Sequence, residues 1–440
     1  MKPQFLISSI GPGNGKTIFA MGLIHALRKR GMKVQPYKCG PEITDTQLLT
    51  LSADNEAVNL DEWITTYTHI QHTYNKYGEK ADACIIEGNG ALFDGYKRMQ
   101  GSSAEIAKLL NVPVVLLVNA RIAGYSIASI IYGFKHFHPQ VKIVGVVFNQ
   151  ITSSAHYSYL KEACFDAGVD CLGYLPYNAE FKLPSKHSSI TLTTKRTMDT
   201  QINLIADDIE KNVNINRLLM NCNRNFPCQY TLPYSSEIEA ETVIPTSQQI
   251  KIAIARDPAF NFIYKENIAR LSIYGKISYF SPVYGSDLPE ADLIYLPGGY
   301  PELFARQLHR RHKLKNALKE YAEKGGKILA ECGGMAFLGR SITAKEGGTS
   351  YEMCNILPLD FTINSKLNSG YRKMIYNGVE LRGYEFHYSA TNNAENSLIA
   401  TQATNIKGTN VDLPLYRYKN IIASYGHWYW GDKDILDLWK

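Results

Sequence analysis

Residues 11–17 read Gly11-Pro12-Gly13-Asn14-Gly15-Lys16-Thr17, and this stretch decides the fold expected for the first half of the chain. It follows a short apolar run at residues 5–7 and precedes a helical pattern at residues 17–30. A glycine-rich turn between a strand and a helix lets backbone N–H groups surround phosphate oxygens. The strict spacing of such loops has glycine at position 10, where this chain has Ile10. We still predict a triphosphate site formed by Gly11, Gly13, Asn14, Gly15, Lys16 and Thr17, with Lys16 on the β and γ oxygens and Thr17 on Mg²⁺.

Further apolar runs continue the pattern at residues 83–87, 112–119 and 143–149. Helical patterns separate them, and continuous apolar strands alternating with helices indicate a parallel sheet covered on both faces. Two carboxylates lie where Mg²⁺ and a reacting phosphate need oxygen ligands, since Glu87 ends a strand and Asp94 follows in a glycine-containing loop.

The second half begins a new set of apolar runs after a stretch rich in Asn, Ser and Pro. These runs lie at residues 251–255, 293–296, 327–330 and 420–423, so the second half is also expected to be α/β. We predict an ATP-binding synthetase domain at 1–211, a linker at 212–249 and a second domain at 250–440, each domain built on a mostly parallel sheet flanked by helices. A chain of 440 residues exceeds what one hydrophobic core usually serves.

The composition is that of an ordinary globular protein, with 45% apolar and 20% charged residues and a net charge of +6. No dense Lys/Arg block marks a nucleic-acid groove, and no apolar run is long enough for a signal peptide or a membrane span. We expect a cytoplasmic protein with a small polyanionic substrate, no nucleic-acid or membrane partner, and a possible homodimer. The eight cysteines are scattered, so most are expected to be buried thiols.

One cysteine differs, because Cys332 lies between the apolar run 328–330 and the glycine pair 333–334. A strand-to-helix elbow of this kind presents a nucleophile, which needs N–H donors for the oxyanion that forms on attack. Gly333 is the expected first donor, and Gly299 in the glycine pair 298–299 could bring a second. Two histidines, His387 and His427, compete for the role of base, and their spacing leaves His427 only slightly ahead.

A phosphate loop and a thiol nucleophile in one chain suggest an ATP-driven reaction supplied by a hydrolysed donor. With both halves considered, the chain resembles the cobyrinate a,c-diamide synthase family along nearly its full length. The resemblance rests on separated stretches at residues 36–42, 59–61, 87–95, 299–302, 331–334 and 384–389. It implies an N-terminal domain similar to dethiobiotin synthetase and a C-terminal domain similar to class I glutamine amidotransferases.

The resemblance also implies the roles of individual residues. Cys332 would attack L-glutamine to give a thioester and ammonia, with His427 as the activating histidine and Gly299 and Gly333 at the oxyanion. ATP would activate a substrate carboxylate as an acyl phosphate, which ammonia converts to an amide. Substrate activation is implied for Lys38, Glu42, Asp45 and Asp94, Mg²⁺ binding for Thr17, Asp45 and Glu87, and adenine recognition for Asn149. The implied substrate is a cobalt corrinoid precursor of cobalamin, amidated on its a and c side chains.

Some positions depart from the family pattern. Residues 42–45 read Glu-Ile-Thr-Asp where the family usually has Asp-Tyr-Ile-Asp, and Asn119 stands where an aspartate is common. Tyr429 replaces a histidine, at a place where class I enzymes often have a glutamate, so His427 would lack an orienting carboxylate and thiolate activation would be weaker. Two alternatives follow. One is amidation of nickel sirohydrochlorin, and the other is a non-catalytic nucleotide switch. The pairing of Cys332 with a histidine argues against the switch.

Overall fold

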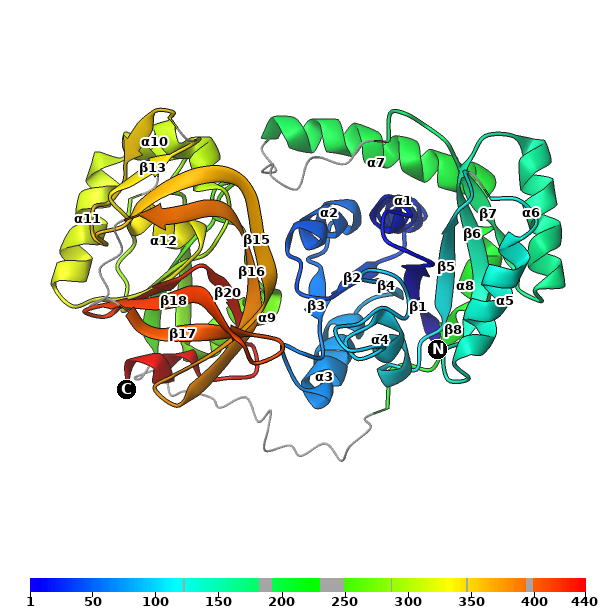
Figure 1. Cartoon of the computed structure of the whole chain (residues 1–440), viewed down its shortest axis with the longest axis horizontal. Helices are drawn as coiled ribbons and strands as arrows, with labels where there is room; N and C mark the ends of the chain where they lie inside the picture. Colours follow the sequence, from blue (N-terminus) through cyan, green and yellow to red (C-terminus); the bar gives the residue numbers. More distant parts are fainter. Residues whose placement is uncertain (122, 182–191, 230–248, 286, 346, 393–398) are drawn as a thin grey trace. The chain divides into compact units, whose positions relative to one another are not determined.

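The computed structural model describes residues 1–121, 123–181, 192–229, 249–285, 287–345, 347–392 and 399–440. These residues form two compact units, each of which is treated by itself (Figure 1). The first contains the described residues up to 229, and the second those from 249 onward.

The first unit is built on a sheet with the strand order β3-β2-β4-β1-β5-β6-β7, in which all neighbours along this path are parallel. The strands are β1 (Lys2–Ser9), β2 (Val34–Cys39), β3 (Val58–Leu60), β4 (Ala83–Glu87), β5 (Val114–Asn119), β6 (Ile143–Ile151) and β7 (Cys171–Pro176). The central strands are buried almost throughout, as continuous apolar runs require in a parallel sheet covered on both faces.

Helices cover both faces of this sheet (Figure 1). They are α1 (Lys16–Lys29), α2 (Thr44–Ala53), α3 (Tyr67–Gly78), α4 (Ser103–Leu109), α5 (Ile127–Phe137), α6 (Ser154–Asp166) and α7 (Leu192–Asn212). Helices α1, α2 and α7 pack against one another, while apolar residues of α3 to α6 join the strands in a separate core. None of the described helices is long and apolar enough to cross a membrane.

The stretch 212–249, expected to be a linker, differs from that expectation in its first half. Residues up to 229 belong to the first unit and include α8 (Ile215–Asn221) and β8 (Asn223–Arg224), which pairs with the start of β1. The Cys222 carbonyl accepts from Gln4 N at 2.9 Å. Buried Ile215, Leu218 and Cys222 explain why this Asn-rich stretch packs on the sheet. The rest of the expected linker, residues 230–248, lies outside the described residues.

The second unit holds a mixed twelve-stranded sheet. Its first part is parallel, with the order β10-β9-β11-β12-β19, and contains the four strands that the apolar runs predicted together with β10, which was not predicted. These are β9 (Ile250–Ala255), β10 (Gly275–Phe280), β11 (Leu293–Leu296), β12 (Lys327–Glu331) and β19 (Ile421–Ser424). The helices of this unit are α9 (Lys265–Tyr274), α10 (Ala305–His309), α11 (His312–Glu323) and α12 (Gly333–Leu338), with 3₁₀ turns at Pro301–Phe304 and Ile435–Trp439.

The remainder of this sheet is mostly antiparallel, which corrects the expectation that the second sheet is mostly parallel throughout. Its strands are β13 (Ser341–Thr343), β14 (Ser350–Glu352), β15 (Asp360–Tyr376), β16 (Val379–Asn392), β17 (Ile399–Asn405), β18 (Asn410–Tyr418) and β20 (Gly426–Tyr429). Figure 1 shows β15 and β16 as a long curved hairpin. Asn377 and Gly378 join them, both with positive φ, as a two-residue hairpin turn demands.

Candidate functional site

The predicted phosphate loop follows β1 and leads into α1. Gly13 and Gly15 have φ of 71° and 89°, a conformation that glycine adopts without steric cost. A Cβ at Gly15 would lie 2.2 Å from Nδ2 of Asn149, so no larger residue fits. The backbone N–H groups at the start of α1 have no partner within the helix, which is the arrangement that binds phosphate.

Lys16 is buried at the edge where β1 and β4 end. Its Nζ donates to Ser9 Oγ at 3.0 Å and to the Gly90 carbonyl at 2.6 Å. Burial, and next the charge of Lys38, lower the pKa of Lys16 below its ordinary value. Bound phosphate would favour the charged ammonium, because an anion nearby offsets both effects.

Asn149, for which the resemblance implied adenine recognition, holds the phosphate loop in place through hydrogen bonds. Its Nδ2 donates to the Asn14 carbonyl at 2.8 Å, and Asn14 Oδ1 accepts from Asn119 N at 3.0 Å. These contacts join the ends of β5 and β6 to the phosphate loop. The role of Asn119 in this link was not foreseen, because hydrogen bonds between distant loops leave no trace in local sequence.

Four of the predicted activation and metal residues meet at the carboxyl ends of β2 and β4. Lys38 Nζ lies 2.8 Å from Asp45 Oδ2 and 3.1 Å from Glu87 Oε1, and Thr17 Oγ1 donates to Glu87 Oε1 at 2.5 Å. Burial raises the pKa of Glu87, although Lys38 opposes the change. For Lys38, burial acts to lower the pKa, but Asp45 and Glu87 outweigh it and raise the pKa.

Glu42 and Asp94 are the two remaining residues to which substrate activation was assigned. The Glu42 charge acts to raise the pKa of both Lys16 and Lys38, so its side chain lies within electrostatic reach of them. Asp94 is exposed, and among the described residues its carboxylate has no hydrogen bond or ion pair. The structure therefore brings Glu42 to the edge of the cluster and does not bring Asp94 into it.

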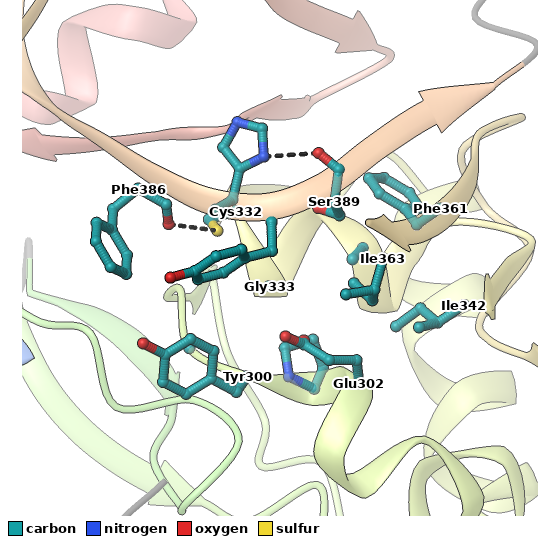
Figure 2. Close-up of a pocket in the computed structure, with 14 residues that line it drawn as sticks. Tyr300, Glu302, Cys332, Gly333, Ile342, Phe361, Ile363, Phe386 and Ser389 are labelled. Carbon is teal, nitrogen blue, oxygen red and sulfur yellow. Dashed lines mark hydrogen bonds between the residues drawn. The ribbon is translucent and has the colours of Figure 1, made fainter. Parts of the chain in front are cut away.

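In the second unit, Cys332 lies at the elbow between β12 and α12. Its backbone has φ 45° and ψ −105°, a strained conformation for a non-glycine residue and one that turns the side chain out of the strand. Cys332 as a whole is 5% exposed, and its thiol donates to the Phe386 carbonyl over 3.9 Å (Figure 2). Burial, followed by the charge of Glu302, raises the pKa of the thiol.

Two glycines border this thiol. A Cβ on Gly333 would lie 3.2 Å from Gly299 N, which places the two backbones side by side, and Gly299 has φ 150° with the Ala259 carbonyl against it. A hydrogen bond from Gly333 N–H acts to lower the pKa of Cys332. Both glycines line one pocket beside the thiol, as expected for donors to an oxyanion.

That pocket is a small one with an apolar side. Figure 2 shows Tyr300 and Glu302 across it from Phe386, with Ile342, Phe361 and Ile363 gathered at one side.

The two candidate histidines lie in different surroundings. His427, on β20, is 2% exposed, and a Cβ added to Gly298 would lie 2.1 Å from its Cε1 and 3.3 Å from Cys332 Cβ. The His427 ring and the Cys332 side chain therefore flank the same glycine. His387, on β16, instead pairs with Glu385 at 2.8 Å.

No hydrogen bond within the described part of the chain orients the His427 ring, which packs edge-to-face with Phe262. Neither ring nitrogen has a partner in hydrogen-bond geometry, although the Phe386 carbonyl favours the protonated form. Burial, and next the charge of His387, lower the pKa of His427 to about 4. Tyr429, which stands where a carboxylate is often found, packs its ring on Tyr264 instead.

Sequence reasoning gave no role to two further residues of this site. Gly298 accommodates the His427 ring, and Glu331 is a fully buried carboxyl directly before Cys332. Glu331 accepts from the Tyr295 hydroxyl at 2.8 Å and from Trp428 N at 3.1 Å, and burial raises its pKa to about 8. The sequence signal that could have identified Glu331 was an acidic residue in an otherwise apolar strand.

A phosphate loop with buried carboxylates in one unit, and a thiol–imidazole pair beside two glycine N–H groups in the other, define an ATP-dependent glutamine amidotransferase. Family models agree, since residues 5–190 match the CobQ/CobB/MinD/ParA nucleotide binding domain and residues 251–435 match the CobB/CobQ-like glutamine amidotransferase domain. The chain belongs to the cobyrinate a,c-diamide synthase family, as its full-length relatives establish.

Three of these relatives are named cobyrinate a,c-diamide synthase. That of Dehalococcoides mccartyi is 36% identical over 98% of this chain and 95% of its own. That of Listeria monocytogenes is 34% identical over 89% and 88%, and that of Sulfurisphaera tokodaii is 33% identical over 97% of each chain.

Proposed function

We propose that this protein is a cobyrinate a,c-diamide synthase, which uses ATP and glutamine to convert the a and c side-chain carboxylates of a cobalt corrinoid precursor into amides. The similarity to the Dehalococcoides mccartyi relative, which extends over 98% of this chain, carries the proposal. The two sites supply the chemistry that such a reaction needs.

In the second unit, Cys332 attacks the side-chain amide of glutamine. The Cys332 thiol loses its proton to His427, and Gly333 and Gly299 donate N–H groups to the oxyanion that forms. The nitrogen leaves as ammonia, and water hydrolyses the remaining thioester. A raised pKa for Cys332 and a pKa of about 4 for His427 favour the uncharged form of both groups in the resting site.

In the first unit, ATP lies with its phosphates against residues 11–17 and Lys16. The substrate carboxylate attacks the γ-phosphorus to give an acyl phosphate and ADP, and ammonia then displaces phosphate to form the amide. Lys38 is held by Asp45 and Glu87 and places a positive charge beside the reacting groups. The negative charge of Glu42 acts on Lys38 in the same direction as those of Asp45 and Glu87, which favours the charged ammonium. Asp94, on an exposed loop, remains a candidate for substrate contact.

The residues present fit Mg²⁺. Thr17 Oγ1 and Glu87 Oε1 adjoin, Glu87 Oε2 is buried with no hydrogen-bond partner, and Asp45 lies on the other side of Lys38. No group of three His, Cys, Asp or Glu residues within the described ranges could hold a metal alone. Mg²⁺ usually takes one or two protein oxygens and completes its shell with water and phosphate. Bound there, it would neutralise charge on the phosphates.

The test is to incubate the protein with ATP, Mg²⁺ and cobyrinate, with either glutamine or ammonium as nitrogen source, and to follow substrate mass. Two carboxyl-to-amide conversions are expected with both sources. Cys332→Ala should lose the glutamine-driven reaction and keep the ammonium-driven one, whereas Lys16→Ala should lose both. No conversion of cobyrinate by a wild-type protein that retains glutaminase activity would refute this substrate, and nickel sirohydrochlorin would be assayed next.

A further inference from the structure

Strand β16 carries the wall of the thiol pocket at a place where its pairing is weakest. Its ladder with β20 ends at Glu385, and its ladder with β15 is interrupted between His387 and Ser389. Phe386 and Tyr388, both of which line the pocket, lie in this segment. Residues 385–387 and Ser389 still pair with β15, but Tyr388 is left out of the ladder, so side-chain contacts contribute to the shape of the pocket wall at this break.

Three charged side chains cluster beside the same segment. Arg372 on β15 binds Glu385 through Nε at 2.6 Å and Nη2 at 2.5 Å, and His387 Nε2 lies 2.8 Å from the other oxygen of Glu385. Their side chains are 13%, 7% and 6% exposed, respectively. Burying a set of charges seldom adds stability over an apolar cluster of similar volume, so another reason for it is needed.

The hydrogen bonds of His387 fix both its orientation and its charge. Its Nδ1 lies 2.8 Å from the Ser389 carbonyl and its Nε2 faces the Glu385 carboxylate. Both partners are acceptors, so both ring nitrogens must carry hydrogen, and the ring matches the imidazolium form. It stacks on Tyr425 with ring centres 3.7 Å apart and planes 9° apart, as a cation on an aromatic face can.

These contacts link residues 385, 387 and 389, whose side chains share one face of β16. The cluster of Arg372, Glu385 and His387, called the staple from here on, spans Phe386 and Tyr388. The Phe386 carbonyl accepts from the Cys332 thiol, and both residues line the pocket. The staple also adjoins the base, because the charges of His387 and Glu385 both act on His427. The staple therefore contacts the segment that holds the Cys332 thiol and also acts electrostatically on His427.

We propose that Arg372, Glu385 and His387 form a positioning device for glutamine hydrolysis: the staple holds the Phe386 carbonyl against the Cys332 thiol and places a net positive charge near His427. Among the described residues, none of the three side chains makes a hydrogen bond to the His427 ring. His387 is therefore a positioning residue and not a catalytic one.

The test compares His387→Gln with wild type in glutaminase assays at several pH values. The side chains around His427 that carry or can carry charge are Cys332, Glu385 and His387, with Arg372 behind Glu385 and Glu331 bonded to Trp428 N. Removing the positive charge makes His427 easier to protonate, so the acid limb of the kcat profile should move to higher pH. We expect kcat to fall by about 10- to 100-fold, the scale of a small misplacement of reacting groups, with little change in KM.

His312→Gln is the matched control, since this histidine is exposed in the same unit, and it should leave both constants and the profile unchanged. An unaltered acid limb and kcat in a folded His387→Gln protein would overturn the proposal. If that variant does not fold, Glu385→Gln keeps the volume of the cluster and breaks the same staple. A wild-type kcat in Glu385→Gln would overturn the proposal equally, while a loss of kcat with ammonium-driven amidation intact would support it.

Discussion

Gly298 offers the sharpest test of the thiol–imidazole geometry. A Cβ at this position would lie 2.1 Å from Cε1 and 2.7 Å from Nδ1 of His427, and 3.3 Å from Cβ of Cys332. Carbon atoms in ordinary contact are about 3.5–4.0 Å apart, so Gly298→Ala must displace the imidazole by about 1.5 Å. The ring is enclosed, which leaves it no alternative position without further movement.

A displacement of about 1 Å at a reacting centre can cost about 100-fold in rate, so Gly298→Ala should reduce glutaminase kcat by at least that factor. Ammonium-driven amidation, which needs neither Cys332 nor His427, should remain at the wild-type rate. Both rates can be measured on one preparation, by glutamate release and by substrate mass.

Gly133→Ala is the matched control. It makes the same substitution in helix α5, where a Cβ meets nothing within 4 Å, and should alter neither rate. Glutaminase activity within about twofold of wild type in a folded Gly298→Ala protein would show that the His427 ring does not work from the observed position, since the expected loss is far larger.

Three other substitutions test the electrostatics. Glu302→Gln removes a charge that raises the pKa of Cys332, so iodoacetamide should alkylate the thiol with a lower pH midpoint, and an unchanged or higher midpoint would contradict this. Glu87→Gln should reduce amidation with either nitrogen source by about 100-fold, the scale of losing one electrostatic contact at a reacting centre, and spare glutaminase; a loss of both activities would point to unfolding instead. Glu331 has a pKa of about 8 in the native state, above its unfolded value, so the native state binds the extra proton and the free energy of unfolding should fall as pH rises from about 5 to 8. Glu331→Gln should flatten that slope in urea titrations, and a slope equal to that of wild type would exclude Glu331 as its source.

The sequence predicted the features that local pattern determines. The phosphate loop, the buried strands β1, β4 and β5, and the elbow at Cys332 each depend on a few consecutive residues, and the structure has them where they were expected. The choice between His387 and His427 could not be made in this way. It depends on which strand passes beside Gly298, a contact between segments more than a hundred residues apart.

The antiparallel part of the second sheet was missed for a different physical reason. Strand β15 is half-buried or exposed along most of its length, so it lacks the apolar run that marks a buried strand. Strand β16 alternates buried and partly exposed residues, but its buried positions include Glu385, His387 and Ser389, which hide the pattern of a core-facing strand. The polar residues that obscured this strand are those of the staple.

The burial of Cys332 affects how the protein responds to oxidation. Oxidants attack thiolates that solvent can reach, and this thiol is enclosed and protonated at rest. Seven of the eight cysteines are buried, and the remaining one, Cys171 in the other unit, is half-buried and has its pKa lowered, chiefly by a hydrogen bond from Cys164. Air and peroxide should therefore modify Cys171 before Cys332. Glutaminase activity should remain when mass spectrometry first detects an oxidised cysteine.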